Sequence, residues 1–408
     1  MEVVHERCCG LDIHKRTVVA CLLRPGQGGQ PEREVRSFST MTRGLLELAD
    51  WLQTAGCTHV AMASTGSFWK PLYNLLEGSF ELLLVNAQHL KAVPGRKTDV
   101  KDAAWIADLL RHGLLRASFV PGRPERELRE LVRYRTSLIR ERAAEVNRIQ
   151  KVLEGANIKL AAVATNVVGV SGRAMLEALV AGNEDPEALA DLARGRLREK
   201  RAALEEALAG RLGAHQRFLL RVQLRHLDDL DTTIATVGEE IEVRLRPFAE
   251  AAERLLTIPG VGPRTAQTFL TEVGPDMRRF PTSGHLASWA AVCPGNRESA
   301  GKRQSGRTRK GSPWLRSALV EAAQAASRTQ TYLGAQYRRL AARRGGRRAT
   351  MAVAHSILLI AYHLLRDGGT YEDLGANYFD QRDRQAVQRR LIHRLEALGY
   401  NVHLEPAA

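Results

Sequence analysis

Three aspartates in the first quarter of the chain are spaced to hold divalent metal ions. Asp12 ends a predicted strand, and Asp99 and Asp102 begin a predicted helix, where a three-residue step places both carboxylates on one face. Metal-assisted phosphodiester chemistry needs several carboxylates around two ions about 4 Å apart, because the ions hold the attacking and leaving oxygens together. Singly, Asp12 could lie in a turn, and Asp99 with Asp102 could cap the helix. Their joint placement favours a metal site.

The elements that must position these aspartates follow from the hydrophobic pattern. Three strands are followed by alternating helices and strands, which is the order of an RNase H-like α/β domain with a mixed sheet. Strands are predicted over 3–11, 16–23, 34–39, 59–62 and 82–85, and helices over 42–52, 69–76 and 99–112. The rest of the chain is predicted to be mainly helical.

Charge indicates the class of partner. The chain has 408 residues, with 60 Lys and Arg against 45 Asp and Glu, a formal net charge of +15 and a pI near 10.0. This length predicts two or three domains, and an apolar content of 44% excludes a wholly disordered chain. A soluble chain this basic attracts polyanions, of which nucleic acid is the commonest.

The sequence predicts a cytoplasmic protein without membrane attachment. Its longest apolar stretch, 351–365, is interrupted by His355, Ser356 and His363 and therefore predicts a buried helix. The first residues lack the basic and then apolar build of a secretory signal. The cysteines are odd in number and form no C-x-x-C pair, which indicates free thiols: Cys8, Cys9, Cys21, Cys57 and Cys293.

The middle of the chain contains two long helical patterns. One apolar stripe runs along 125–153, among arginines and glutamates that fit either a phosphate-contacting helix or a solvated one. A second series of apolar residues runs along 220–241, and its members are separated by three or four positions. Such steps are typical of either a coiled-coil seam or an intramolecular helical hairpin.

The last third contains segments suited to a nucleic-acid backbone. The stretch 256–266 has the form of a helix-hairpin-helix, in which Gly260 and Gly262 let the backbone approach a phosphate and Arg264 begins the next helix. A plain turn between packed helices is the alternative. The residues 293–311 predict an exposed loop that contacts phosphate, and a flexible linker or a localisation signal is the alternative. The cations of this loop are Arg297, Lys302, Arg303, Arg307, Arg309 and Lys310. A further basic patch spans 338–348.

Three fragments carry a resemblance to a known family. They are GLDIHK at 10–15, STGSFWKP at 64–71 and KTDVKDA at 97–103. They strongly resemble the DEDD-type insertion-sequence transposases, which are recombinases guided by a bridge RNA. The resemblance implies a RuvC-like N-terminal domain that binds Mg²⁺ through four acids, an RNA-binding and oligomerising helical region, and a C-terminal transposase domain with a nucleophilic serine. We place these domains at 1–122, 123–248 and 249–408.

The resemblance also implies site residues. The family's serine lies in a Ser-Gly-Gly-Lys-like stretch, which the run from Ser299 to Lys302 matches, with Ser305 as the rival. Ser299 would bond to a DNA 5′ phosphate where the acids of another subunit meet it, in a dimer or tetramer. A guide RNA would pair with donor and target duplex DNA. Its protein contacts would come from the helix over 125–153: Arg133, Arg135 and Arg142.

One position departs from the family pattern. Where the family has a metal-binding glutamate after its fourth strand, this chain has Ala63, whose methyl group cannot bind a metal. Natural divergence and an inactivating substitution would both explain Ala63, and the fit of the flanking residues favours the substitution. We therefore expect an RNA-guided DNA recombinase that is impaired in this chain. The alternatives are a metal-dependent junction resolvase or nuclease without serine chemistry, and a non-catalytic nucleic-acid-binding protein.

Overall fold

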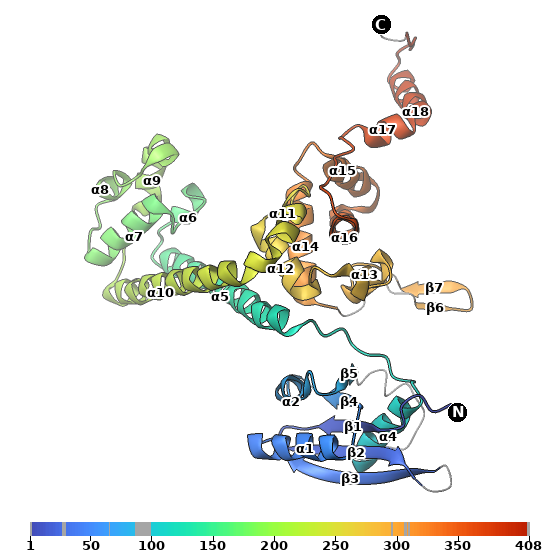
Figure 1. Ribbon diagram of the computed structural model, residues 1–408. Coiled ribbons are helices and arrows are strands. Elements are labelled where there is room, and N and C mark those ends of the chain that lie inside the picture. The colour runs from blue at the N-terminus through green and yellow to red at the C-terminus, as the bar shows by residue number, and fades with distance from the viewer. Residues whose placement is uncertain are drawn as a thin grey trace. The chain divides into compact units, whose positions relative to one another are not determined.

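The structure is a computed structural model that divides into two compact units, Met1–Arg123 and Pro124–Ala408 (Figure 1). It describes residues 2–26, 30–64, 66–85, 99–294, 297–305, 308 and 311–405. For residues 64, 99–101, 297–299 and 303–305 it describes the backbone alone. Each unit has its own hydrophobic core.

A five-stranded mixed sheet forms the centre of the first unit, in the order β3-β2-β1-β4-β5. The strands are β1 (Cys8–Ile13), β2 (Thr17–Pro25), β3 (Pro31–Ser39), β4 (His59–Ser64) and β5 (Glu81–Val85). The first three pair antiparallel, whereas β4 runs parallel to both β1 and β5. The predicted order of strands and helices is confirmed, but β1 begins at Cys8 rather than residue 3 and contains Asp12, which we expected beside the turn.

Helices cover both faces of this sheet because β1 and β2 are apolar on both sides. Leu11, Val18 and Leu22 face α1 (Thr42–Thr54) and α2 (Trp69–Leu76). Cys8 and Cys21 face α4 (Asp99–Arg111) in a second cluster. The alternation along each strand therefore assigns odd-numbered residues of β1 to one layer and even-numbered residues, Asp12 among them, to the other. All five cysteines are free, as predicted.

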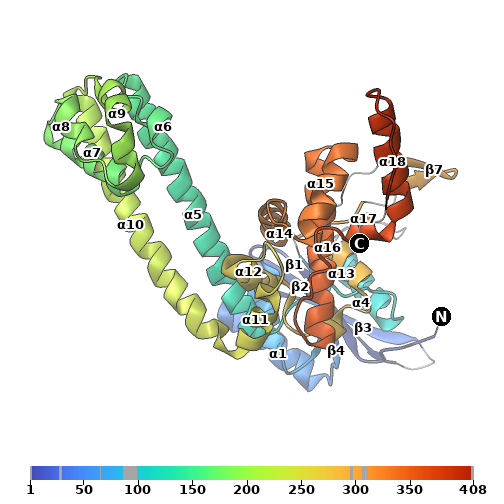
Figure 2. The same cartoon turned by 90° about the horizontal axis from the view of Figure 1, so that it is seen from above.

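Two long antiparallel helices dominate the start of the second unit. They are α5 (Arg123–Gly155) and α10 (Ala214–Leu245), which lie side by side in Figure 2. Leu224 packs in one cluster with Ile149, and Ile241 packs with Leu128 at the opposite end of the pair. The predicted apolar series is thus buried within the chain, which confirms the intramolecular alternative. Small helices cap the far end: α6 (Leu160–Val163), α7 (Val170–Ala181), α8 (Pro186–Ala190), η2 (Gly195–Lys200) and α9 (Arg201–Leu208).

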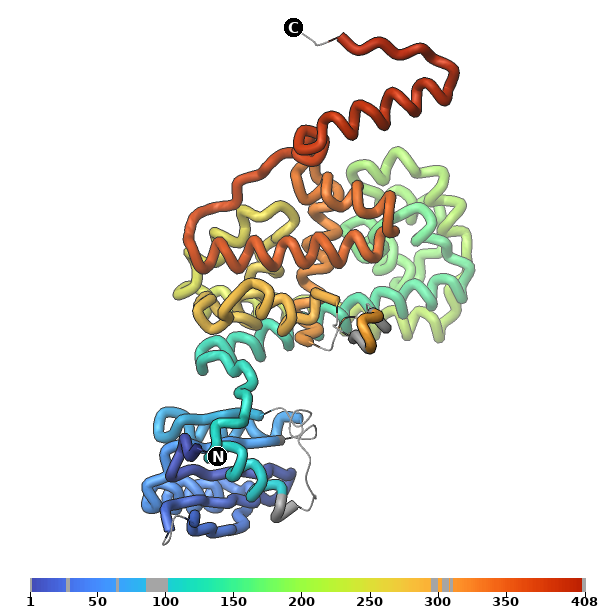
Figure 3. Tube along the Cα trace, turned by 90° about the vertical axis from the view of Figure 1, so that its right-hand side faces the viewer, coloured from blue at the N-terminus to red at the C-terminus, as the bar shows by residue number. Residues whose placement is uncertain are grey.

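The remaining helices accompany one apolar helix, α16 (Gly346–Asp367), and several of them pack against it. They are η3 (Arg246–Phe248), α11 (Ala249–Leu256), α12 (Pro263–Val273), η4 (Met277–Arg279), α13 (Ser283–Trp289), α14 (Pro313–Ala326), α15 (Tyr332–Arg344), α17 (Tyr378–Arg382) and α18 (Arg384–Glu396). Helix α16 is long and apolar enough to cross a membrane, a test that core helices also pass. Its buried residues, such as Val353 and Tyr362, confirm the predicted buried helix. Figure 3 shows α18 extending away from this group.

The basic loop of the last third folds back on itself as a short β-hairpin. Strand β6 (Arg297–Ser299) pairs antiparallel with β7 (Lys302–Ser305), and only two residues connect them. Both have positive φ, +51° at Ala300 and +71° at Gly301, as a two-residue type I′ turn requires. Ala300, Gly301 and Lys302 are exposed, as predicted for this loop.

The turn predicts opposite effects for substitutions at its two positions. An alanine at positive φ is strained by roughly 1 kcal/mol, so A300G should stabilise the hairpin and slow amide exchange across β6 and β7. G301A should accelerate exchange through backbone strain alone, because a Cβ at Gly301 would meet no atom within 4 Å. Hydrogen exchange monitored by mass spectrometry measures both. Equal exchange in the two variants would contradict this turn.

Candidate metal and nucleic-acid sites

Asp12 and Ala63 are neighbours in the first sheet. Asp12 of β1 is opposite Ala63 of the parallel strand β4 and opposite Val19 of β2. Residues opposite each other in adjacent strands share a face and lie about 4.8 Å apart. Ala63 is 7% exposed and belongs to the cluster beneath α4. A longer side chain at position 63 would therefore extend beside the Asp12 carboxylate.

The start of α4 lies over the same part of the sheet. A Cβ at Gly10 would lie 2.3 Å from the carbonyl oxygen of Ala103 and 2.4 Å from the backbone nitrogen of Ala107, so α4 passes directly over β1. Farther back along β1, the Sγ atom of Cys8 lies 3.8 Å from the carbonyl oxygen of Ala107. Helix and strand are thus antiparallel. Two strand residues advance about 6.6 Å, or roughly four helical residues, which brings Asp12 level with the first turn of α4.

That first turn contains the other two predicted ligands. Asp102 is half-buried, and Asp99 is the first residue of α4. The Asp12 side chain is 16% exposed, and its Oδ2 lies 3.2 Å from Nε2 of His14. The part of the chain whose side chains are described contains no group of three metal-ligating residues, and the Asp99 carboxylate is outside that part. The three-aspartate site, and a role for position 63 in it, therefore stay a prediction.

The β6–β7 hairpin distinguishes the two candidate serines by position. Ser299 is the last residue before the turn and is opposite Lys302, whereas Ser305 is opposite Arg297 at the other end of the hairpin. Only the backbones of Arg297, Ser299, Arg303 and Ser305 are described, while the Lys302 side chain is described and exposed. The other predicted cations of the loop lie outside the described residues: Arg307, Arg309 and Lys310.

The predicted helix-hairpin-helix consists of α11, a turn and α12. Gly260 has φ +87°, and a Cβ there would lie 2.3 Å from the carbonyl oxygen of Ala322 in α14. Gly260 therefore admits the close approach of α14, and its contact with a phosphate stays a prediction. Gly262 has open space around its Cα and precedes α12, and Arg264 is exposed. These two positions stay available for a backbone contact.

The three arginines predicted to contact RNA have partners within the chain. Arg133 donates to both carboxylate oxygens of Glu272, at 2.7 and 2.8 Å. Buried Arg135 donates to the Oε1 atom of Gln267, and Arg142 donates to both oxygens of Asp231. A phosphate would have to compete with these acceptors. These three arginines of α5 are thus engaged within the chain, and their contacts with RNA stay a prediction.

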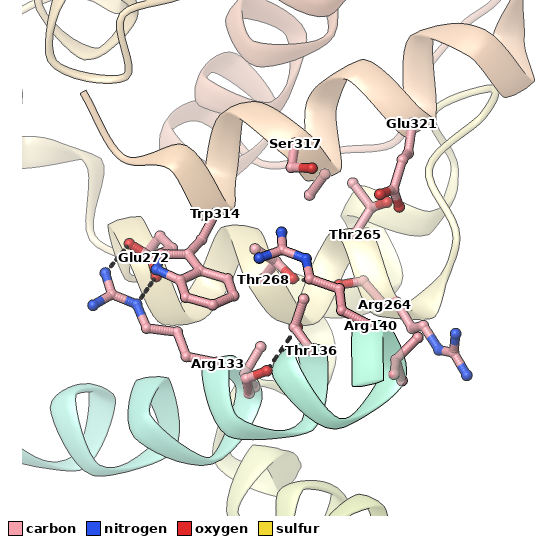
Figure 4. Close-up of a pocket in the computed structure, with 13 residues that line it drawn as sticks. Arg133, Thr136, Arg140, Arg264, Thr265, Thr268, Glu272, Trp314, Ser317 and Glu321 are labelled. Carbon is pink, nitrogen blue, oxygen red and sulfur yellow. Dashed lines mark hydrogen bonds and ion pairs between the residues drawn. The ribbon is translucent and has the colours of Figure 1, made fainter. Parts of the chain in front are cut away.

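A surface pocket lies between α5, α12 and α14, and Figure 4 shows the side chains that line it. The Arg140 guanidinium stacks 4.8 Å from the centre of the Trp314 ring. Neither Arg140 nor Arg264 has an ion pair among the side chains that the structure describes. Burial and the nearby Arg264 lower the pKa of Arg135. Positive charge is therefore in excess here, although Glu321 also lines the pocket.

Sequence reasoning missed Glu272, Trp314 and Arg140. Glu272 is almost completely buried, and its only signal was an acid within the largely apolar end of α12. Trp314 lines the pocket, and its sequence context does not distinguish it from a tryptophan that anchors a core. Arg140 was one of several arginines on α5, and the pattern alone could not separate it from those with internal partners.

Comparison with known proteins identifies relatives of this chain. A DEDD family model of the IS110 type, described as "Transposase", matches residues 9–158, and the model of the "Transposase IS116/IS110/IS902 family" matches residues 252–338. An uncharacterised 43.6 kDa protein of insertion element IS110 from Streptomyces coelicolor is 30% identical over 68% of this chain and 73% of its own length. A probable family 20 transposase from Pseudomonas aeruginosa is 26% identical over 66% and 71%, respectively. The transposase of element IS1111A from Coxiella burnetii is 26% identical over 71% and 72%. The chain therefore belongs to the DEDD-type IS110 family of transposases.

Proposed function

We propose that this chain is an RNA-guided DNA recombinase whose RNase H-like metal site is impaired by Ala63. The observation that carries the proposal is the pairing of Asp12 with Ala63 beneath the first turn of α4. A glutamate at position 63 would complete a group of four acids with Asp12, Asp99 and Asp102. Mg²⁺ bound there would stabilise charge on the oxygens of a scissile phosphate.

The second half of the proposed reaction belongs to Ser299. Its hydroxyl oxygen loses a proton and bonds to phosphorus, the bond from phosphorus to the 3′ oxygen breaks, and the 3′ oxygen takes up a proton, so that no net proton is gained or lost. Lys302, opposite Ser299 across the turn, places a cation where negative charge develops. This chemistry preserves the phosphodiester energy in a serine-DNA bond, so that a second DNA end can replace the serine.

The partners are nucleic acids and further copies of the chain. A guide RNA pairs with donor and target duplex DNA, and a dimer or tetramer brings the acids of one subunit to Ser299 of another. Within each chain the RuvC-like domain spans 1–122, the RNA-binding and oligomerising helices span 123–248, and the transposase domain spans 249–408. The complex acts in the cytoplasm.

Two other functions make different predictions. A junction resolvase would use water in place of Ser299 and would leave no protein attached to DNA. A non-catalytic nucleic-acid-binding protein is favoured by Ala63 itself and would bind without cleaving even as A63E.

The test is recombination by the full chain carrying A63E. RNA co-purified with the protein is sequenced, and two plasmids with segments complementary to it are incubated with the protein and Mg²⁺. Joined donor and target products, found by sequencing across the junctions, are the expected result. Cleavage without joining would favour the resolvase, and binding alone would favour the non-catalytic protein.

Arg140 is the α5 arginine that we expect to contact nucleic acid. R140A should weaken binding of the co-purified RNA, and it should reduce the slope of log affinity against log salt by about 0.7 to 0.9 for the lost phosphate contact. R43A removes the same charge from a side chain that is 93% exposed in the first unit, and it serves as the control. Identical affinities and slopes in R140A and R43A would contradict the contact.

A further inference from the structure

Glu272 is a buried carboxylate of the second unit that accepts hydrogen bonds from two different elements. Its side chain is 2% exposed near the end of α12. It accepts two hydrogen bonds from Arg133 of α5, at 2.7 and 2.8 Å, and one from the Ser312 hydroxyl at 3.0 Å. A buried carboxylate is tolerated only where charge and hydrogen bonds compensate the loss of water. Glu272 therefore holds two separate elements, α5 and the start of α14, against α12.

A second arginine strengthens the connection to α5. Arg129 donates from Nε to the carbonyl oxygen of Thr271 at 2.9 Å and from Nη2 to that of Glu272 at 2.7 Å. Burial, only partly offset by Glu272, lowers the pKa of Arg129 to about 10. The end of α12 is thus fixed to α5 through both its backbone and its acidic side chain.

Ser312 connects this centre to the β6–β7 hairpin. Its hydroxyl accepts the backbone N–H of Leu315 at 3.3 Å, which caps α14, while donating to Glu272. The preceding residue, Gly311, is pressed against the end of α13, where a Cβ would lie 2.7 Å from the carbonyl oxygen of Trp289. Pro294 and Thr308 form a bridge across the base of the loop. The chain is therefore held at Ser312, seven residues after the end of β7.

We propose that Glu272 is a positioning residue that fixes the β6–β7 hairpin, and with it Ser299, relative to α5. This inference rests on the proposed serine chemistry. Because α5 and α12 also line the pocket with Arg140, the same carboxylate sets the hairpin in a defined place relative to the surface proposed to contact nucleic acid. Glu272 contacts neither DNA nor the reacting atoms in this role.

The first measurement is hydrogen exchange of the peptide that spans β6 and β7. S312A removes the hydroxyl link and leaves the Arg133–Glu272 pair in place, so exchange of this peptide should accelerate about tenfold, the factor for one lost hydrogen bond. T331A is the matched control, because Thr331 caps α15 in the same way by accepting from the Gly334 N–H. It should leave hairpin exchange unchanged. E272Q should accelerate hairpin exchange at least as much as S312A does.

The second measurement separates positioning from stability. In the A63E chain, S312A should reduce the rate of covalent attachment to DNA by about tenfold while DNA affinity changes less than about threefold. S312T, which keeps the hydroxyl, should restore the rate. Unchanged hairpin exchange in both S312A and E272Q would overturn the proposal, as would accelerated exchange with an unchanged rate of attachment.

Failure of the proposed function gives a different result. If the A63E chain forms no covalent adduct with DNA, with or without substitutions in the β6–β7 hairpin, the serine chemistry is wrong. The proposal that Glu272 positions Ser299 is then overturned with it. Hairpin exchange in S312A still reports whether Glu272 and Ser312 hold the hairpin. The two failures therefore produce distinct combinations of adduct and exchange.

Discussion

Replacing Ser299 with alanine in the A63E chain should abolish the covalent protein-DNA adduct. The reason is chemical, because no other group in the hairpin turn has an oxygen that can bond to phosphorus once the Ser299 hydroxyl is gone. RNA and DNA binding should remain within about tenfold of the A63E parent, since one hydroxyl contributes at most ~1.5 kcal/mol to a complex. Denaturing gel electrophoresis of labelled DNA measures the adduct, and filter binding measures the affinities.

Ser305 provides the matched control. It is in the same hairpin but opposite Arg297, away from the turn, so S305A should retain most of the adduct. If only S305A removes the adduct, the serine has been assigned six residues too early. If the adduct survives both substitutions, the serine mechanism does not apply. Loss of nucleic-acid binding in S299A would indicate instead that the hairpin itself had been disrupted.

The order of strands and helices in the first unit was predictable because it depends on local patterns. Alternating apolar residues along β1 and β2 specify two buried faces, and the helical spacing of α1 and α4 specifies what covers them. The position of Asp12 within β1 was not predictable to the residue. It depends on pairing with Val19 and Ala63, which are distant in sequence.

The partners of charged side chains were the least predictable feature. The sequence indicates that α5 is rich in arginine, but Arg133 is paired with a carboxylate 139 positions later. Gly260 illustrates the same difficulty, since a glycine that admits a neighbouring helix and one that admits a phosphate have the same local sequence signature. In both cases the deciding contact is between elements, and it became visible only when α12 and α14 were placed.

The hairpin turn was missed for a local reason. A type I′ turn favours Gly or Asn at its first central position, and this chain has Ala300. Of the two central positions, only Gly301 has a residue that favours positive φ, so the sequence indicates the turn weakly. The surrounding cations favour an unstructured loop. The family stretch with two glycines would have indicated the turn.

Introducing glutamate at position 63 should make stability depend strongly on divalent metal. The new carboxylate would lie beside Asp12 in a largely buried place, so A63E in EDTA should unfold at a lower temperature than the parent chain, with a loss on the order of 2 kcal/mol. Metal binding to the native state should turn this loss of stability into a gain. At a Mg²⁺ concentration about 100 times Kd, linkage adds ~2.7 kcal/mol to the free energy of unfolding.

The control for this effect is A63Q, which has the same length without the charge. Its amide is a weak metal ligand, so its melting temperature should change little between EDTA and Mg²⁺. Titration calorimetry should give tighter Mg²⁺ binding to A63E than to the parent, and D12N added to A63E should remove that gain. An equal response to Mg²⁺ in the parent, A63E and A63Q would mean that position 63 is not a ligand. The Asp12 carboxylate beneath α4 would then need another explanation, because the register that places Ala63 beside Asp12 leaves no nearer position on β4 for a fourth acid.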